Sequence, residues 1–280
     1  EQDRSDENQH ASSEEDRSDL SAETHRRVRE AGVKPRRNLV IRESPANWTI
    51  WHTMRYVLRI PTYRLLVVAS GLGYFFFAGV RAFGMIYLTG HYGLSRGVAS
   101  ALVFVVGIGA VAGVIGGGRL SDWLFRRGWL DARIVVPGIA LLLAAVLTAP
   151  AIWISSPIVG FALLTLGTAA LAAANPPLDA ARLDIVHARL WGRAESGRMA
   201  LRGLLEGIAP ILFGWVSGQL GGGSSGLQST FLIMLIPVLA ASSLAIPTRR
   251  TYPADVATAD ASTRSILEAQ DRTQASGSRR

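Results

Sequence analysis

The chain has 280 residues, of which 49% are hydrophobic and 18% charged, and its formal net charge is +8 at pH 7. It contains no cysteine, which excludes disulfides and thiolate chemistry. The positive charge does not indicate nucleic-acid binding, because the basic residues gather in short connections between apolar blocks. We therefore expect no nucleic-acid partner.

The first 46 residues are polar and rich in Ser, Asp, Glu and Arg. They begin with Glu1 rather than Met, which we interpret as the start of a fragment or a cleaved product. Their composition buries too little apolar surface to offset the entropy of ordering, so residues 1–46 are predicted to be disordered. Residues 25–42 are basic, which favours contact with anionic lipid on the cytoplasmic face.

Residues 47–60 are predicted to form a short amphipathic helix that lies in the membrane interface. Tryptophan side chains favour the level of the lipid headgroups. The apolar and basic side chains recur at helical spacing: Trp48, Trp51 and Val57 or Leu58, with Arg55 and Arg59 beside them.

Six apolar blocks follow, each close to the roughly 20 residues that cross a hydrocarbon core. They run over residues 64–89, 99–118, 133–153, 157–177, 200–220 and 228–247. Only helices and closed barrels span a bilayer, because every backbone polar group needs an internal partner. The blocks lack the period-two alternation of barrel strands. We therefore predict an all-α, polytopic membrane protein with a six-helix bundle over residues 61–247.

The connections between the blocks predict the orientation. Arginines crowd the second and fourth connections and the segment after the last block, whereas the third and fifth connections have no basic residue. The positive-inside rule then puts both termini in the cytoplasm, in the cell (inner) membrane. Residues 248–280 are polar again and are predicted to be a disordered cytoplasmic tail.

A short charged segment, residues 116–128, connects the second and third blocks. Its pattern is Gly-x-x-x-Asp-x-x-x-Arg-Arg-Gly, formed by Gly118, Asp122, Arg126, Arg127 and Gly128. It resembles the loop signature of the major facilitator superfamily of secondary transporters, found between helices two and three and, in weaker form, between helices eight and nine. The basic pair after the last glycine is absent here, so the weaker copy is the better match.

The resemblance implies the C-terminal six-helix half of such a transporter, with residues 1–46 as a cytoplasmic inter-domain loop. It also implies alternating access around a central cavity, a small-molecule substrate of unknown identity, and an N-terminal half of the same transporter as partner. Residues 206–214, Glu-Gly-x-x-Pro-x-x-x-Gly, resemble the eleventh helix of the spinster-like branch, which often has Gly-Asp in that region.

Ionisable groups inside a membrane are costly, at about 2.5–3.5 kcal/mol each on insertion scales, so each needs a reason. Arg81 shares a helical face with Tyr74, which predicts a cavity-lining cation that meets an anionic substrate or a carboxylate. The alternative is a side chain that reaches the outer headgroups. Glu206 is a candidate for carrying a coupling proton. Its alternative is an ion pair with Arg202, one helical turn away.

Two charged groups are expected at the inner face. Asp122 would lie at the positive end of a helix dipole and pair with Arg126 or Arg127 as a gate. The resemblance implies instead a partner for Asp122 on the other half, and the plain alternative is a solvated turn. The second group is Asp179, Arg182 and Asp184, which form either a hinge-side charge cluster or a solvated surface.

No catalytic residues, metal ligands or cofactor-binding motif are found, and none of the five histidines lies inside an apolar block. We therefore expect a protein that is not an enzyme and needs no cofactor. Two further hypotheses remain open beside transport by a half that needs its partner. One is a non-transporting membrane scaffold or half-transporter subunit, and the other is a six-helix transporter that acts as a homodimer.

Overall fold

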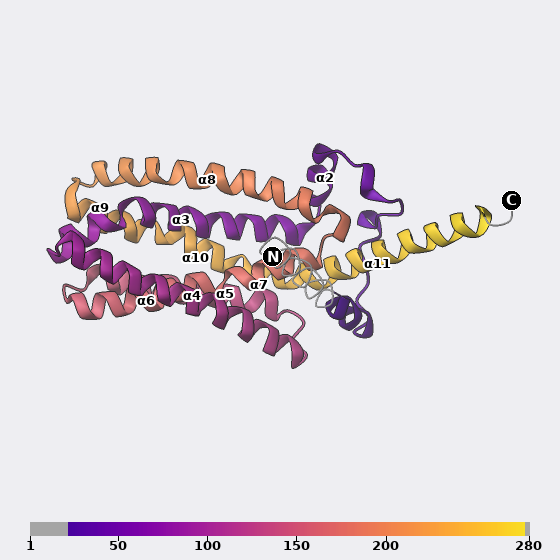
Figure 1. The fold of residues 1–280 in the computed structure, drawn as a ribbon, viewed down its shortest axis with the longest axis horizontal. Helices are drawn as coiled ribbons and strands as arrows, with labels where there is room; N and C mark the ends of the chain where they lie inside the picture. Colours follow the sequence, from indigo (N-terminus) through magenta and orange to yellow (C-terminus); the bar gives the residue numbers. More distant parts are fainter. Residues whose placement is uncertain (1–21, 278–280) are drawn as a thin grey trace, which may run out of the picture. The chain divides into compact units, whose positions relative to one another are not determined.

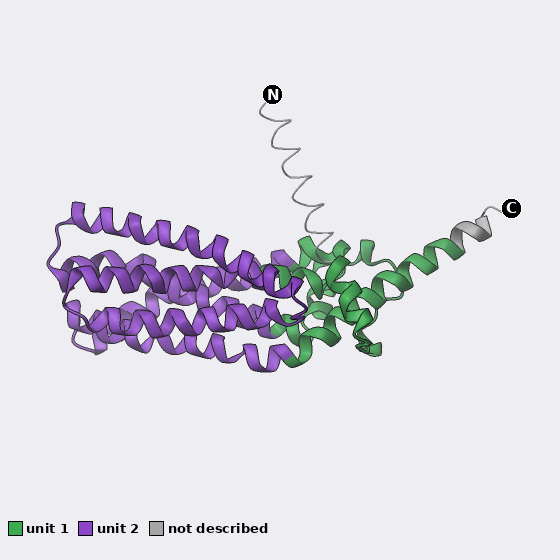
Figure 2. Cartoon of the chain, turned by 90° about the horizontal axis from the view of Figure 1, so that it is seen from below, with its two compact units in different colours: residues 1–64, 179–194, 250–280 green, residues 65–178, 195–249 purple. Residues whose placement is uncertain are grey.

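The computed structural model describes residues 22–277, so residues 1–21 and 278–280 of the predicted disordered ends lie outside it. The described residues form helices and their connections, with no strand among them. They divide into two compact units (Figure 2). Unit 1 takes its residues from 1–64, 179–194 and 250–280, and unit 2 comprises 65–178 and 195–249. The predicted all-α class is confirmed.

Unit 2 is built from long helices that lie side by side (Figure 1). The helices that contribute to it are α3 (Pro61–Tyr92), α4 (Arg96–Arg126), α5 (Ala132–Trp153), α6 (Pro157–Ala173), α8 (Trp191–Gln219), α9 (Gly223–Ile233) and α10 (Leu235–Ser243), with the ends of α7 (Asn175–Asp184) and α11 (Ala245–Gly277). Among the described residues, six helical stretches are long and apolar enough to cross a membrane. They correspond to the six predicted blocks, so the chain is a multi-pass membrane protein.

Two of the spans are interrupted helices. The fourth breaks at Ala174 between α6 and α7, because Pro176 and Pro177 have no backbone N–H to continue the preceding hydrogen-bond ladder. The last span is divided among α9, α10 and α11, with junctions at Met234 and Leu244. The second and fifth spans run well past their apolar blocks, because α4 continues to Arg126 and α8 begins at Trp191.

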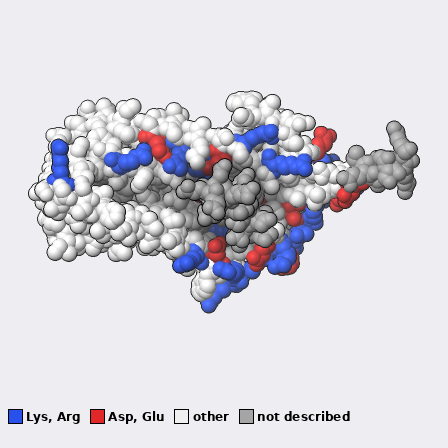
Figure 3. Space-filling view, viewed as in Figure 1, with Lys and Arg blue, Asp and Glu red and all other residues white. Residues whose placement is uncertain are grey.

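The surface of unit 2 is apolar where a soluble protein would be polar. Large side chains such as Phe104, Ile108 and Val111 are exposed along α4. In the view of Figure 3, the surface of unit 2 is mostly uncharged, with few blue or red atoms. Water-soluble monomers rarely expose apolar surface on this scale, whereas hydrocarbon chains solvate it well.

Glycines bring α4 close to α6 inside unit 2. A Cβ atom added at Gly113 would overlap the carbonyl oxygen of Ala169, and one at Gly117 would overlap that of Ala173. The two backbones are therefore in direct contact, a packing that only small residues allow in membrane helices.

Unit 1 gathers the segments at the ends of the chain. It contains a helix over residues 22–30, η1 (Arg37–Leu39), η2 (Pro45–Asn47), α2 (Ile50–Val57), η3 (Ala188–Leu190) and most of α11. Residues 22–46 and 248–277 therefore have regular structure where the composition predicted disorder. The difference arises because each polar segment supplies the hydrogen-bond partners of the other, which composition alone does not reveal.

A short strap, residues 36–41, contains the 3-10 turn η1 and follows one face of α11. The backbone N–H of Arg36 donates to the Thr258 hydroxyl at 2.9 Å, and that of Ile41 donates to the Ser262 hydroxyl at 3.0 Å. The Ser265 hydroxyl donates in turn to the carbonyl of Ile41 at 2.5 Å. Hydroxyl groups of the helix thus replace the backbone partners that a neighbouring strand would supply.

Asp255 is the buried acid that fixes the strap. Its carboxylate accepts from Nε of Arg36 at 2.7 Å and from the backbone N–H of Thr62, near the start of α3, at 3.0 Å. Nearby, the Tyr56 hydroxyl donates to the carbonyl of Leu39 at 2.8 Å. Burial raises the pKa of Tyr56 to about 12, so this bond keeps its proton near neutral pH.

We expect Gly113→Ala to destabilise the bundle by about 1–3 kcal/mol, because the new methyl group forces α4 away from α6. Gly116→Ala is the matched control on the same helix, since a Cβ there meets nothing within 4 Å. Thermal unfolding of the reconstituted chain would compare the two variants. Equal unfolding temperatures would contradict the close helix contact.

We expect Asp255→Asn to weaken the strap while still accepting the N–H of Thr62, because the Arg36 guanidinium loses a charge-assisted hydrogen bond. Trypsin cleavage after Arg37 and Arg42 should become roughly tenfold faster or more, since cleavage requires local opening. Glu268→Gln, an exposed acid on the same helix, serves as the control. Unchanged cleavage in Asp255→Asn would argue against the strap.

Candidate functional site

The ionisable residues predicted inside the membrane meet at the contact between α3 and α8. Nη2 of Arg81 lies 3.7 Å from Oε2 of Glu206, and the other carboxylate oxygen accepts from Nε of Arg202. The Glu206 side chain is 19% exposed, whereas that of Arg81 is 65% exposed. The Glu206 carboxylate thus lies between two guanidinium groups. Their positive charges offset the free-energy cost of removing this carboxylate from water.

Tyr74 joins this group through Arg202 rather than through Arg81. The guanidinium carbon of Arg202 lies 3.3 Å from the centre of the Tyr74 ring, a cation–π contact. We call Tyr74, Arg81, Arg202 and Glu206 the charge cluster. With two arginines and one ionised carboxylate, its net charge is +1. The predicted pair of Glu206 with Arg202 is formed, and so is a contact of Arg81 with a carboxylate.

Aromatic packing holds α3 and α8 in this register. Phe213 of α8 is fully buried, and its ring centre lies 6.1 Å from that of Phe75 and 6.3 Å from that of Phe83 on α3. Gly79 lies under the same ring, where any Cβ atom would overlap it. The missing side chain at Gly79 therefore lets the two helices approach, about two turns of α8 from the carboxylate of Glu206.

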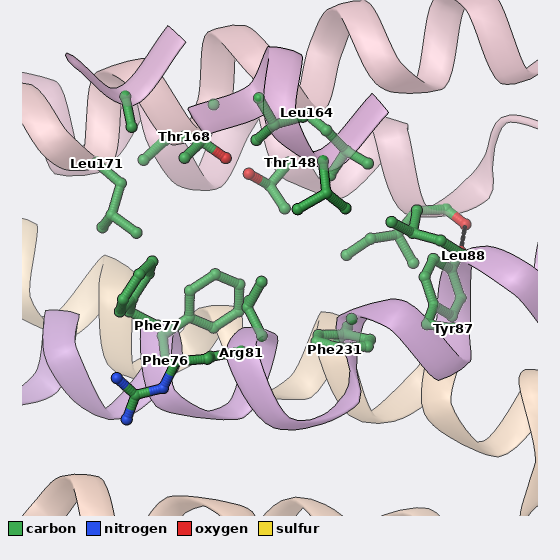
Figure 4. Close-up of a pocket in the computed structure, with 18 of the residues that line it drawn as sticks. Phe76, Phe77, Arg81, Tyr87, Leu88, Thr148, Leu164, Thr168, Leu171 and Phe231 are labelled. Atoms are coloured by element: carbon green, nitrogen blue, oxygen red, sulfur yellow. Dashed lines mark hydrogen bonds between the residues drawn. The ribbon is translucent and has the colours of Figure 1, made fainter. Parts of the chain in front are cut away.

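Beside the charge cluster, unit 2 contains a partly open cavity of about 420 Å³ between α3, α4, α5, α6, α9 and α10. Its lining is almost entirely apolar, with Arg81 at its margin and the hydroxyls of Thr148 and Thr168 among the few polar groups. Figure 4 shows these two hydroxyls oriented toward each other, while the guanidinium of Arg81 points away from them. Sequence reasoning missed both threonines, because single threonines inside apolar blocks give no distinctive pattern.

The charged signature lies mainly on a helix, not in a loop. α4 continues to Arg126, and the turn comes at Gly128, whose φ of +96° favours glycine. Asp122 is in the last turns of α4, at the negative rather than the positive end of its dipole. Its predicted pair with Arg126 or Arg127 is not formed, and no ion pair of Asp122 occurs within the part of the chain that the structure describes. Arg127 instead covers the ring of Trp123, 3.8 Å from its centre.

The predicted inner-face group of Asp179, Arg182 and Asp184 divides into two parts within unit 1. Arg182, almost fully buried, pairs with Asp179 one turn before it on α7. Asp184 is also buried, and its carboxylate accepts from the hydroxyl of Tyr252 on α11 at 2.5 Å. His25 contacts the backbone carbonyl of Asp184 at 2.9 Å. Asp184 therefore joins three distant segments, which the alternative of a solvated surface did not anticipate.

These features define a class of protein: a multi-pass helical membrane bundle, with a partly open cavity and ion-paired groups between its spanning helices. Among residues 22–277, no group of three or more His, Cys, Asp or Glu side chains is arranged to hold a metal ion. No family model matches the chain, and no curated protein matches it significantly.

Solved structures identify the fold more closely. The chain is similar to a bacterial homolog of the human lysosomal transporter Spinster in its inward-facing, unoccupied conformation, with 19% identity, a TM-score of 0.62, and coverage of 75% of this chain and 51% of that one. The occupied inward-facing conformation gives 19% identity, a TM-score of 0.58, and coverage of 70% and 50%.

The chain therefore spans about half the length of these transporter structures. It therefore shares the fold of about half of these transporter structures, which agrees with the predicted resemblance at the level of fold.

Proposed function

We propose that the chain is the C-terminal half of a secondary transporter, which moves a small solute by alternating access together with an N-terminal half. One observation carries this proposal. Glu206 lies between Arg81 and Arg202 at a contact of two membrane-spanning helices. Ionisable groups are costly there, so their presence indicates a function. The likeness to half of a transporter fold supports the same reading.

In the proposed mechanism, Glu206 exchanges a proton during the cycle. Protonation removes its negative charge, which releases Arg81 from the pair while Arg202 remains stacked on Tyr74. The exposed guanidinium of Arg81 is then free to pair with an anionic group of the solute. Loss of the proton restores the ion pair and displaces that group, so proton and solute movements are coupled.

The proposed gate uses the signature of α4 and the turn that follows it, namely Gly118, Asp122, Arg126, Arg127 and Gly128. Asp122 is half-buried and has no ion pair in the described residues, so its carboxylate is available to a partner on the other half. A latch between halves would close the cytoplasmic side, as the resemblance implies. In this orientation, the arginine-rich connections and both termini face the cytoplasm.

We expect Glu206→Gln to reduce proton-driven flux of the complete transporter more than roughly tenfold, because the variant cannot exchange the proton. Solute exchange without a pH gradient should persist. Proteoliposome flux would measure both, with Glu195→Gln as control, since Glu195 also pairs with an arginine on α8. Full proton-driven flux in Glu206→Gln would remove the coupling role. A wild-type protein without any flux would favour a scaffold instead.

We expect Asp122→Asn to reduce transport by the complete protein while membrane insertion stays intact, because the variant loses the charge that latches the halves. Asp271→Asn, an exposed acid in α11, is the control. Uptake or efflux kinetics would be measured beside the amount of inserted protein. Normal kinetics in Asp122→Asn would exclude gating by this residue.

A further inference from the structure

The helix α2 carries a face that unit 1 leaves uncovered. Ile50, Trp51 and Leu58 are 61%, 79% and 47% exposed, which are high values for large apolar side chains. At 100° per residue, these three side chains and Met54 occupy one continuous arc of about 100° on the helix. Arg55 and Arg59, also exposed, border that arc on one side.

The neighbouring face of α2 is packed onto the rest of unit 1. Thr53 and Val57 are fully buried there, and the Tyr56 hydroxyl donates to the carbonyl of Leu39 in the strap. Trp48, predicted as a second membrane anchor, instead packs against His52 and Tyr56, with ring centres 4.5 and 5.3 Å away. The helix is therefore fixed in rotation, and its exposed face has one defined direction relative to unit 1.

Charge indicates what covers this face. Residues 33–60 contain six basic residues and one acid, Glu43, so their net charge is +5. The position of α2 in the chain also indicates a lipid partner. α2 ends at Val57 and the membrane-spanning helix α3 begins at Pro61, so their ends are at most about 14 Å apart along the chain. A surface that is apolar at its centre, basic at its border and this close to a bilayer fits anionic phospholipid.

We propose that the exposed face of α2 docks into the headgroup layer of an anionic membrane leaflet. Ile50, Trp51 and Leu58 enter the interface, while Arg55 and Arg59 contact lipid phosphates. Because the other face of α2 holds the strap, lipid composition then acts on the position of unit 1. This inference does not depend on the proposed transport function, since lipid docking is measured without any flux.

The absence of cysteine allows a direct test. Ile50→Cys, labelled with a nitroxide, reports the docking face, and His52→Cys reports the exposed polar side of the same helix. The whole chain is placed in nanodiscs of phosphatidylcholine, with or without about 30% phosphatidylglycerol. Collision with oxygen, which concentrates in lipid, is compared with collision with a water-soluble nickel chelate.

We expect the label at position 50 to move into lipid with phosphatidylglycerol, while the label at position 52 stays in water. Trp51→Ser should weaken docking, and Arg55→Gln and Arg59→Gln should each weaken the preference for anionic lipid about fivefold. Equal water contact of both labels in both lipids would overturn the proposal. Equal docking in both lipids would overturn its electrostatic part, as would an unchanged preference in the arginine variants.

Discussion

Inside a bilayer, a charged group must find its counter-charge within the protein, and the contact between α3 and α8 depends on this constraint. Glu206 accepts from Arg202 on its own helix and faces Arg81 on the neighbouring one. The pair of Arg202 with Glu206 is local, because residues four apart lie on the same face of a helix. The pair with Arg81 instead requires α3 and α8 to be in register. Phe213 over Gly79 supplies that register through packing alone. Apolar contact thus sets the register of α3 and α8, and this register brings Arg81 close to Glu206.

The two compact units satisfy their buried polar groups in different ways. In unit 2, backbone groups are paired inside helices, and side chains provide packing between them, as at Gly113 against Ala169. In unit 1, polar side chains bind backbone groups of other segments, as Asp255 binds the N–H of Thr62 and Ser262 that of Ile41. A solvent of hydrocarbon favours the first solution, and contact with water permits the second. The composition of each segment already reflects its solvent.

Block length and the cost of charge in lipid were enough to predict the six spans and to select Tyr74, Arg81 and Glu206 as candidates. Their arrangement was not predictable, because Tyr74 reaches the cluster through Arg202, a contact between helices more than 120 residues apart in sequence. The dipole argument for Asp122 failed because α4 continues past this residue to Arg126, so Asp122 lies near the negative end of the helix. Disorder was predicted for residues 1–46 from their polar composition, and contacts such as that of Ile41 with Ser262, 221 residues away, leave no trace in composition.

The exposure of Arg81 separates two roles that the sequence could not. A guanidinium that only reached the headgroups would have no reason to approach a carboxylate, whereas a purely structural pair would be buried on both sides. Arg81 is 65% exposed yet lies 3.7 Å from Glu206, so it is held loosely at the margin of a cavity. In the proposed cycle, Arg81 exchanges Glu206 for an anionic group of the solute, and a pair with one exposed partner leaves that guanidinium accessible to such a group.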